Sequence, residues 1–147
     1  AIFGIISIIY ASLTTIRQVD LKRIIAYSSV AHMNVVLLGL FAANPNGLQG
    51  AVFLMLAHGI VSSALFFIIG NLYKRHGTRL LNYYGGLAFR MPLFSIYLLI
   101  FCLANVGTPL TFNFIGELMI FISLVDKNFF ILILSASSVV LSVIYTM

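Results

Sequence analysis

The sequence predicts an all-α integral membrane protein with about five transmembrane helical segments, one of them broken. Of its 147 residues, 62% are hydrophobic and only 7% are charged, and the mean hydropathy is +1.14. A soluble domain is typically about half apolar and about a quarter charged, so this chain has too few polar residues to cover a water-exposed surface. The lipid bilayer is its natural solvent, and each long apolar run should be helical because lipid offers backbone groups no partners.

Five apolar runs follow one another, and we expect them to form a single transmembrane domain over residues 1–147. The expected segments are residues 1–16, 24–43, 50–72, 91–125 and 128–147. About 20 apolar helical residues are needed to cross the hydrocarbon. The first segment is shorter than that, so we expect its beginning to be missing from the sequence.

The basic residues gather in two of the four links between these runs. Residues 17–23 and 73–90 hold seven of the eight Lys and Arg side chains, whereas residues 44–49 hold none and residues 126–128 form a short polar turn. Alternating spans put the first and third links on one side of the membrane, and basic loops face the cytoplasm or, in a mitochondrion, the matrix. The net charge of +5 therefore reflects membrane orientation, and we expect no nucleic-acid partner.

The fourth run, residues 91–125, contains 35 residues and is too long for one straight span. Near its middle, Gly107 loosens the backbone, and Pro109 removes a backbone donor and disfavours helix before it. We expect two half-helices on either side of a break near residues 105–111. Non-helical backbone at that depth is tolerated only inside protein or beside water, and such breaks are common at the ion sites of transporters. The alternative is one helix followed by a re-entrant or interfacial piece.

Glu117 is the most informative residue for function because it lies among apolar neighbours in the second half-helix. A charge at the centre of a bilayer costs roughly 2.5–3.5 kcal/mol on insertion scales, and such residues normally face the protein interior or water and have a function there. We therefore expect Glu117 to exchange protons. The alternative is a structural acid that pairs with a base from another helix.

Two histidines also lie within predicted spans, His32 in the second and His58 in the third. Histidine changes charge near neutral pH and can pass protons on, so together with Glu117 they suggest a proton relay. The alternatives are two buried histidines with local hydrogen-bond partners, or the two axial ligands of one haem. Counting about 1.5 Å per residue from the basic side puts His32 at a depth of roughly 12 Å and His58 at roughly 21 Å, which argues against a shared haem.

Lys22 and Cys102 are two further residues of interest. Lys22 lies at a membrane boundary, where its spacing alone indicates an orientation anchor. Cys102 is the single cysteine, and one thiol cannot hold an iron–sulfur cluster, so we expect it to be a packing residue. The sequence contains no nucleotide-binding or hydrolase motif and no cluster of zinc ligands. We therefore expect no cofactor, redox centre or metal in this chain.

Three stretches of the chain resemble known sequence signatures. They are residues 20–33 (DLKRIIAYSSVAHM), residues 54–59 (LMLAHG) and residues 114–117 (FIGE). Together and in this order, they resemble the antiporter-like subunits of respiratory complex I. The resemblance runs along nearly the whole chain. It implies the second of the two inverted five-helix repeats of such a subunit.

The resemblance also implies a function. Glu117 would be the charged residue of the broken helix in an output half-channel, and His58 and His32 would lie on the hydrophilic axis leading to it. Lys22 would belong to the same proton relay. The chain would be part of a proton-translocating subunit that couples NADH:ubiquinone electron transfer to proton pumping. It would lie in the mitochondrial inner membrane or, alternatively, in a bacterial plasma membrane, with FMN, iron–sulfur clusters and ubiquinone bound elsewhere in the complex.

Two departures from the family pattern leave alternatives open. Residues 106–109 read VGTP, whereas the family commonly has Leu-Pro-Gly-Thr or Leu-Pro-Pro-Thr. The first repeat is not in this sequence, which lacks an initiator Met, so we expect a split-gene product or an incomplete chain. Its partners would then be other membrane-arm subunits, including a chain that supplies the first half. The competing functions are a subunit of a multisubunit cation/proton antiporter and a purely structural half-subunit of the membrane arm.

Overall fold

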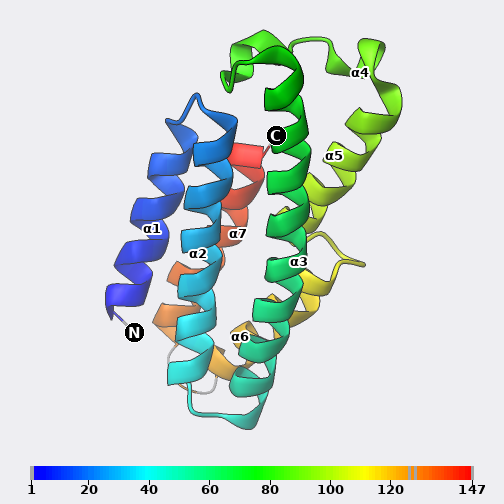
Figure 1. The fold of residues 1–147 in the computed structure, drawn as a ribbon. Coiled ribbons are helices and arrows are strands. Elements are labelled where there is room, and N and C mark those ends of the chain that lie inside the picture. The colour runs from blue at the N-terminus through cyan, green and yellow to red at the C-terminus, as the bar shows by residue number, and fades with distance from the viewer. Residues whose placement is uncertain (1, 126, 128, 147) are drawn as a thin grey trace.

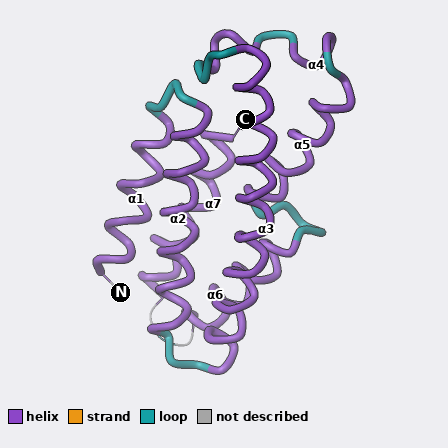
Figure 2. Tube along the Cα trace, in the orientation of Figure 1, coloured by secondary structure: helices purple, strands orange, loops and turns teal. Residues whose placement is uncertain are grey.

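The computed structural model describes residues 2–125, 127 and 129–146, and the described residues form helices joined by short links (Figures 1 and 2). The elements are α1 (Ile2–Ile16), α2 (Leu21–Phe41), α3 (Pro45–His76), the 3-10 turn η1 (Leu81–Tyr84), α4 (Leu87–Arg90), α5 (Pro92–Val106), α6 (Phe112–Val125) and α7 (Phe129–Thr146). The all-helical class is therefore confirmed. Two residues of the predicted polar turn, Asp126 and Asn128, lie outside the described residues.

The long helices lie side by side and alternate in direction, with α5 and α6 following each other along one crossing (Figure 1). The first and third links meet at one end of this bundle. There Asp20 and Leu80 form an isolated antiparallel bridge. The backbone N–H of Leu21 donates to the carbonyl of Arg79 at 3.1 Å, and that of Leu81 donates to Val19 at 3.0 Å. The basic residues of both links are thus gathered at the same end, as the charge pattern predicts.

Helix α3 and the start of α2 extend further into the polar links than the predicted apolar runs do. Helix α2 starts at Leu21, three residues before the predicted segment, and α3 runs for 32 residues from Pro45 to His76. Proline suits the first turn of a helix because its missing N–H has no partner there. At the other end Gly77 adopts φ +69° and its N–H donates to the Tyr73 carbonyl at 2.8 Å, which ends the helix.

Three of the described helices, α2, α3 and α7, are long and apolar enough to cross a bilayer. The helices α1, α5 and α6 are also apolar but shorter. Large apolar side chains cover the outside of the bundle, among them Phe3, Phe67, Phe89 and Phe130. A surface of this kind is stable against lipid rather than water.

The core lies where α1, α2, α3 and α6 meet, and its most deeply buried members include Ile8, Leu38, Leu54 and Ile120. Helices α3 and α6 approach each other closely at Gly116. A Cβ atom added to this glycine would lie 2.8 Å from the Leu54 Cβ and 3.0 Å from its Cα. Small residues allow such close approach between membrane helices. The contact at Gly116 also brings the next residue, Glu117, into the centre of the bundle.

Candidate functional site

The site is built around the break between α5 and α6, which appears as a loop halfway along the bundle (Figure 2). Gly107 ends α5 with φ +77°. The backbone N–H and the hydroxyl of Thr108 both donate to the Leu103 carbonyl, at 3.3 and 3.2 Å. The side-chain amide of Asn113 donates to the Ala104 carbonyl at 2.9 Å. These bonds satisfy carbonyls that the end of the helix would leave unpaired in the membrane, so the predicted break is confirmed.

Glu117 lies in α6 with only 5% of its surface exposed. Its Oε1 is 3.1 Å from Nδ1 of His32 on α2. Its Oε2 faces the break, since a Cβ added to Gly107 would lie only 2.8 Å from this oxygen. The glycine therefore has two effects. It ends α5, and it leaves space for the carboxyl group of Glu117.

His32 and His58 lie against each other on the neighbouring helices α2 and α3. Their ring centroids are 5.0 Å apart and their planes are tilted by 37°. Both residues are buried, with 5% and 3% of their surface exposed. The structure thus brings Glu117, His32 and His58 into one continuous cluster, which we call the relay cluster.

The ring nitrogens of this cluster have few other partners. Within the described chain, Nε2 of His32 and both nitrogens of His58 lack a hydrogen-bond partner. The hydroxyls that flank them in sequence are bonded elsewhere: Ser28 donates to the Ile25 carbonyl and Ser62 to the Gly59 carbonyl, each within its own helix. The alternative of two histidines with local partners therefore does not describe these side chains.

The predicted difference in depth between His32 and His58 is wrong, because the two rings are in contact. The estimate assumed that α2 and α3 begin at the same level on the basic side. In fact α3 continues to His76 and projects past the start of α2 (Figure 1), and the chain then returns so that Leu80 pairs with Asp20. The haem alternative is instead opposed by the contact itself, because rings in direct contact leave no space for a porphyrin between them.

Lys22 is the one predicted site residue that the structure does not bring into the cluster. It is exposed on the first turn of α2, ten residues before His32, which corresponds to about 15 Å along the helix. It lines a hollow with Tyr73 and Arg79, and the Arg79 guanidinium lies 4.3 Å from the centre of the Tyr73 ring. Its surroundings are those of the basic end, not those of Glu117.

One wall of the site was not predicted from the sequence. Ser138, Ser142 and Tyr145 of α7 join His32 and Glu117 around a cavity of about 10 Å³, close to the smallest volume that accommodates one water molecule. The serines were detectable as a pattern, because Ser135, Ser138 and Ser142 recur at helical spacing in an apolar segment and all three are buried. Such spacing places them on one face of the helix.

Comparisons with known proteins agree with this architecture. The family model described as NADH:quinone oxidoreductase/Mrp antiporter, TM, matches residues 1–144. The NADH-ubiquinone oxidoreductase chain 4 of Marchantia polymorpha is 52% identical over 144 residues, which are 98% of this chain and 29% of that protein. The chain therefore spans less than a third of the length of this relative.

Two solved structures have closely similar folds. A chain of respiratory complex I from Thermus thermophilus with bound NADH superposes with a TM-score of 0.94 at 32% identity, covering 97% of this chain and 31% of that chain. A chain of the membrane-bound sulfane sulfur reductase, an archaeal respiratory membrane complex, gives a TM-score of 0.91 at 32% identity, covering 97% and 29%. The predicted resemblance is confirmed, and the chain belongs to the NADH:quinone oxidoreductase/Mrp antiporter transmembrane family.

Proposed function

We propose that this chain is the second-repeat part of a proton-translocating membrane-arm subunit of respiratory complex I. The observation that carries the proposal is the buried relay cluster, in which Glu117 is 3.1 Å from His32 and His32 is in ring contact with His58. Ionisable groups inside a membrane segment are costly and normally mark an ion pathway or proton relay. Relatives named as complex I chain 4 support the same assignment.

The arrangement suits stepwise proton transfer. A proton reaching His58 gives an imidazolium next to His32, and passing it to His32 brings the positive charge beside the Glu117 carboxylate, where it is stabilised. An imidazole can accept a proton at one nitrogen and release one from the other. His32 has Nδ1 towards Glu117 and Nε2 free of protein partners in the described structure. Transfer to Glu117 then leaves both groups neutral, so no net charge stays buried.

The break in the fourth crossing places the Glu117 carboxyl group between two surfaces that could change its surroundings. Its second oxygen faces Gly107, and the α7 wall with Ser142 and Tyr145 lies beside it. Release of the proton from Glu117 would follow a change at one of these two surfaces. The direction of net transport follows the family resemblance, which assigns Glu117 to the output half-channel.

Lys22 belongs to the proposal as a residue of the basic end. The support for its role is its match to the family signature and its position among Tyr73 and Arg79 at that end. We propose that it takes part in the proton relay on the side where protons enter.

The wider setting of the subunit is part of the same proposal. Electron transfer from NADH to ubiquinone would occur in other subunits, which hold FMN, the iron–sulfur clusters and the quinone, and this chain would hold no redox centre. Its partners would be the lipid bilayer and the other membrane-arm subunits. The eukaryotic chain 4 relatives support the mitochondrial inner membrane, and a bacterial plasma membrane is the alternative.

A second candidate is a subunit of a multisubunit cation/proton antiporter. The description of the matching family includes Mrp antiporters, and a buried Glu–His pair serves proton exchange in either setting. A native gel separates the two: after gentle solubilisation of the membrane, the band that contains this chain is identified by mass spectrometry. NADH dehydrogenase activity in a very large band supports complex I, whereas a smaller band without flavin or iron–sulfur subunits supports the antiporter.

Glu117→Gln tests the role of the relay cluster in whichever assembly contains the chain. The amide keeps the size of the side chain but cannot exchange a proton. We expect assembly on the native gel to stay near normal while proton translocation in closed vesicles falls more than tenfold. Normal translocation in a normally assembled complex would overturn the relay. Loss of assembly in place of loss of translocation would indicate the structural half-subunit.

A further inference from the structure

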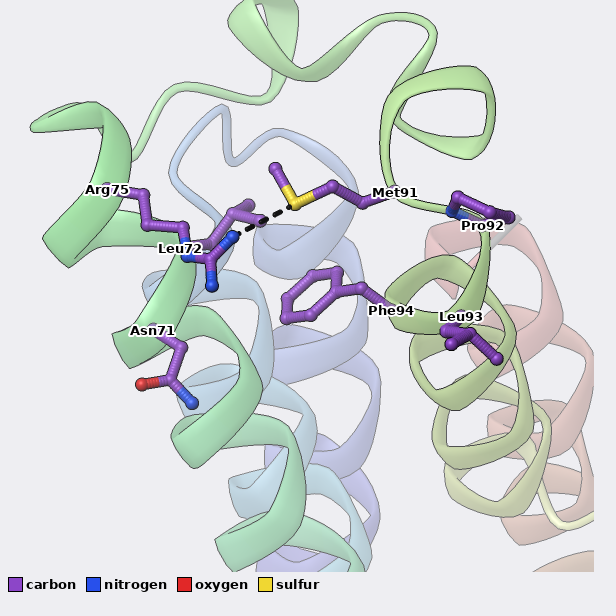
Figure 3. Close-up of a pocket in the computed structure, with 7 residues that line it drawn as sticks. All are labelled: Asn71, Leu72, Arg75, Met91, Pro92, Leu93 and Phe94. Carbon is purple, nitrogen blue, oxygen red and sulfur yellow. Dashed lines mark hydrogen bonds between the residues drawn. The ribbon is translucent and has the colours of Figure 1, made fainter.

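A second hollow, of about 450 Å³, opens at the basic end of the bundle between the end of α3 and the start of α5. Its lining residues are Asn71, Leu72, Arg75, Met91, Pro92, Leu93 and Phe94 (Figure 3). In Figure 3, Arg75 and Met91 reach towards each other from the two sides, and the Phe94 ring points from α5 towards α3. This hollow lies away from the relay cluster and shares no residue with it.

Arg75 provides the charge at this hollow. It is exposed, and its described hydrogen bond runs from Nη1 to the Met91 sulfur at 3.6 Å. A thioether sulfur is a weak acceptor, so most of the guanidinium donors remain available. The planar guanidinium matches the oxygens of a phosphate group and binds them in a bidentate manner.

The surroundings of Arg75 favour an anion. The link after α3 also carries Arg79 and Arg90, and it contains no acidic residue. Among the described residues of this end, the acid is Asp20, whose Oδ2 lies 3.3 Å from Nε of Arg23. A neighbouring hollow of about 320 Å³, lined in part by Arg90, shares Met91 with the hollow at Arg75.

The deeper wall of the hollow is apolar. Leu72 is buried with 3% of its surface exposed, and Phe94 faces it across the gap (Figure 3). A free anion gains nothing from such a wall, whereas a hydrocarbon chain does. The hollow thus has a cationic opening at the membrane boundary and an apolar wall inside the membrane. These match the anionic headgroup and the hydrocarbon chain of a phospholipid.

We propose that this hollow binds an anionic phospholipid, with its phosphate at Arg75 and one acyl chain against Phe94. The basic end is the one expected to face the cytoplasm or matrix. Basic pockets between membrane helices on that side are suited to anionic lipid headgroups. The proposal depends on the chain spanning a membrane and is independent of the relay cluster.

The test uses the intact complex in nanodiscs with a photoactivatable phosphatidylglycerol that carries its diazirine in an acyl chain. A phosphatidylcholine with the same diazirine serves as the lipid control, and labelled peptides are mapped by mass spectrometry. We compare the parent chain with Arg75→Gln, and with Lys74→Gln, which removes the same charge at the same end from a residue outside the lining. Phe94→Ala removes the aromatic ring from the apolar wall and leaves Arg75 in place.

We expect the phosphatidylglycerol probe to label residues 71–75 and 91–94 and the phosphatidylcholine probe to label them less. Arg75→Gln should lower this labelling about fivefold, which corresponds to ~1 kcal/mol for one basic residue near the membrane surface. Phe94→Ala should lower it as well, whereas Lys74→Gln should leave it unchanged. Excess inorganic phosphate should not displace the lipid.

Four results would overturn the proposal: equal labelling by both lipids, equal effects of Arg75→Gln and Lys74→Gln, displacement by inorganic phosphate, or labelling elsewhere. Displacement would show that the site takes a free anion. Absence of label from the hollow would show that protein covers it. If a variant fails to assemble, the two lipid probes and the phosphate competition on the parent chain still test the proposal.

Discussion

Gly107 lies directly against the carboxyl group of Glu117, so that a Cβ atom at this glycine would be 2.8 Å from Oε2. The residue that ends α5 and the acid of α6 are thus parts of one local structure, although ten positions separate them in the sequence. The backbone of Gly107, with φ +77°, also belongs to the region that residues with a side chain rarely adopt.

Gly107→Ala should impair proton translocation because the new methyl group displaces the Glu117 carboxyl group. Strain at positive φ adds about 1–2 kcal/mol of destabilisation, measured as a lower melting temperature of the purified assembly. Gly86→Ala is the matched control, since Gly86 has the same φ of +77° with no atom within 4 Å of the added Cβ. If both variants translocate protons equally well, the contact with Glu117 has no functional role.

His32→Leu should abolish most proton translocation while electron transfer continues or slows. The substitution removes the partner that lies 3.1 Å from Glu117, and a buried carboxylate left without its partner costs roughly 3–5 kcal/mol. The path from His58 to Glu117 should therefore be interrupted at this step. Translocation is measured by acidification in closed vesicles driven by NADH. His76→Leu, at an exposed histidine of the basic end, should change the rate less than twofold; an equal loss in both variants would contradict the relay.

Gly116→Ala should destabilise the packing of α3 against α6 by roughly 1–3 kcal/mol, the usual cost of overpacking. The added Cβ would meet the Cβ, Cα and backbone nitrogen of Leu54 at 2.8–3.0 Å. Thermal unfolding of the detergent-solubilised assembly measures the effect, and Gly70→Ala on α3, with no atom within 4 Å, is the control. Leu54→Ala should fail to rescue the variant, since the atoms that clash remain in alanine. A full rescue would show that the clash lies further out on the side chain.

Leu110→Gly should stabilise the protein by about 0.5–1 kcal/mol. Leu110 adopts φ +83° in the break and is fully exposed, and the left-handed region costs a residue with a side chain about 1–2 kcal/mol, partly offset by the entropy of glycine in the unfolded chain. Leu118→Gly, at a partly exposed position inside α6, should be destabilising by ~1 kcal/mol. Melting temperatures of the two variants should therefore move in opposite directions. A lower melting temperature for Leu110→Gly would show that its side chain makes contacts worth more than the strain.

Residue types and spacing were enough to predict the helical segments, the gathering of the two basic links at one end, and the break. The positions of the arginines and lysines indicated the shared end, and Gly107 with Pro109 marked the interruption. The contact between His32 and His58 could not be predicted, because it depends on how far α3 projects beyond α2. Counting residues from a presumed membrane surface does not provide that distance.

Other features could not be predicted from the sequence because they depend on packing between distant segments. The wall formed by Ser138, Ser142 and Tyr145 requires knowing which face of α7 turns towards Glu117. Likewise, nothing in the sequence indicates that Leu110 has a positive φ. This angle follows from the path of the loop between two helices that are held in place by their own contacts. The local pattern identified the candidate acid, whereas only the folded chain identifies what surrounds it.

The two backbone hydrogen bonds between the first and third links have a consequence for His32 and His58, which lie further along α2 and α3. Leu21 is bonded to Arg79, and Val19 to Leu81, so the start of α2 is bonded to the link that follows α3 at His76. Sliding of one helix along the other by a single residue, about 1.5 Å, would have to break these bonds. These two bonds therefore fix the start of α2 relative to the link that follows α3, which keeps the imidazole rings of His32 and His58 opposite each other.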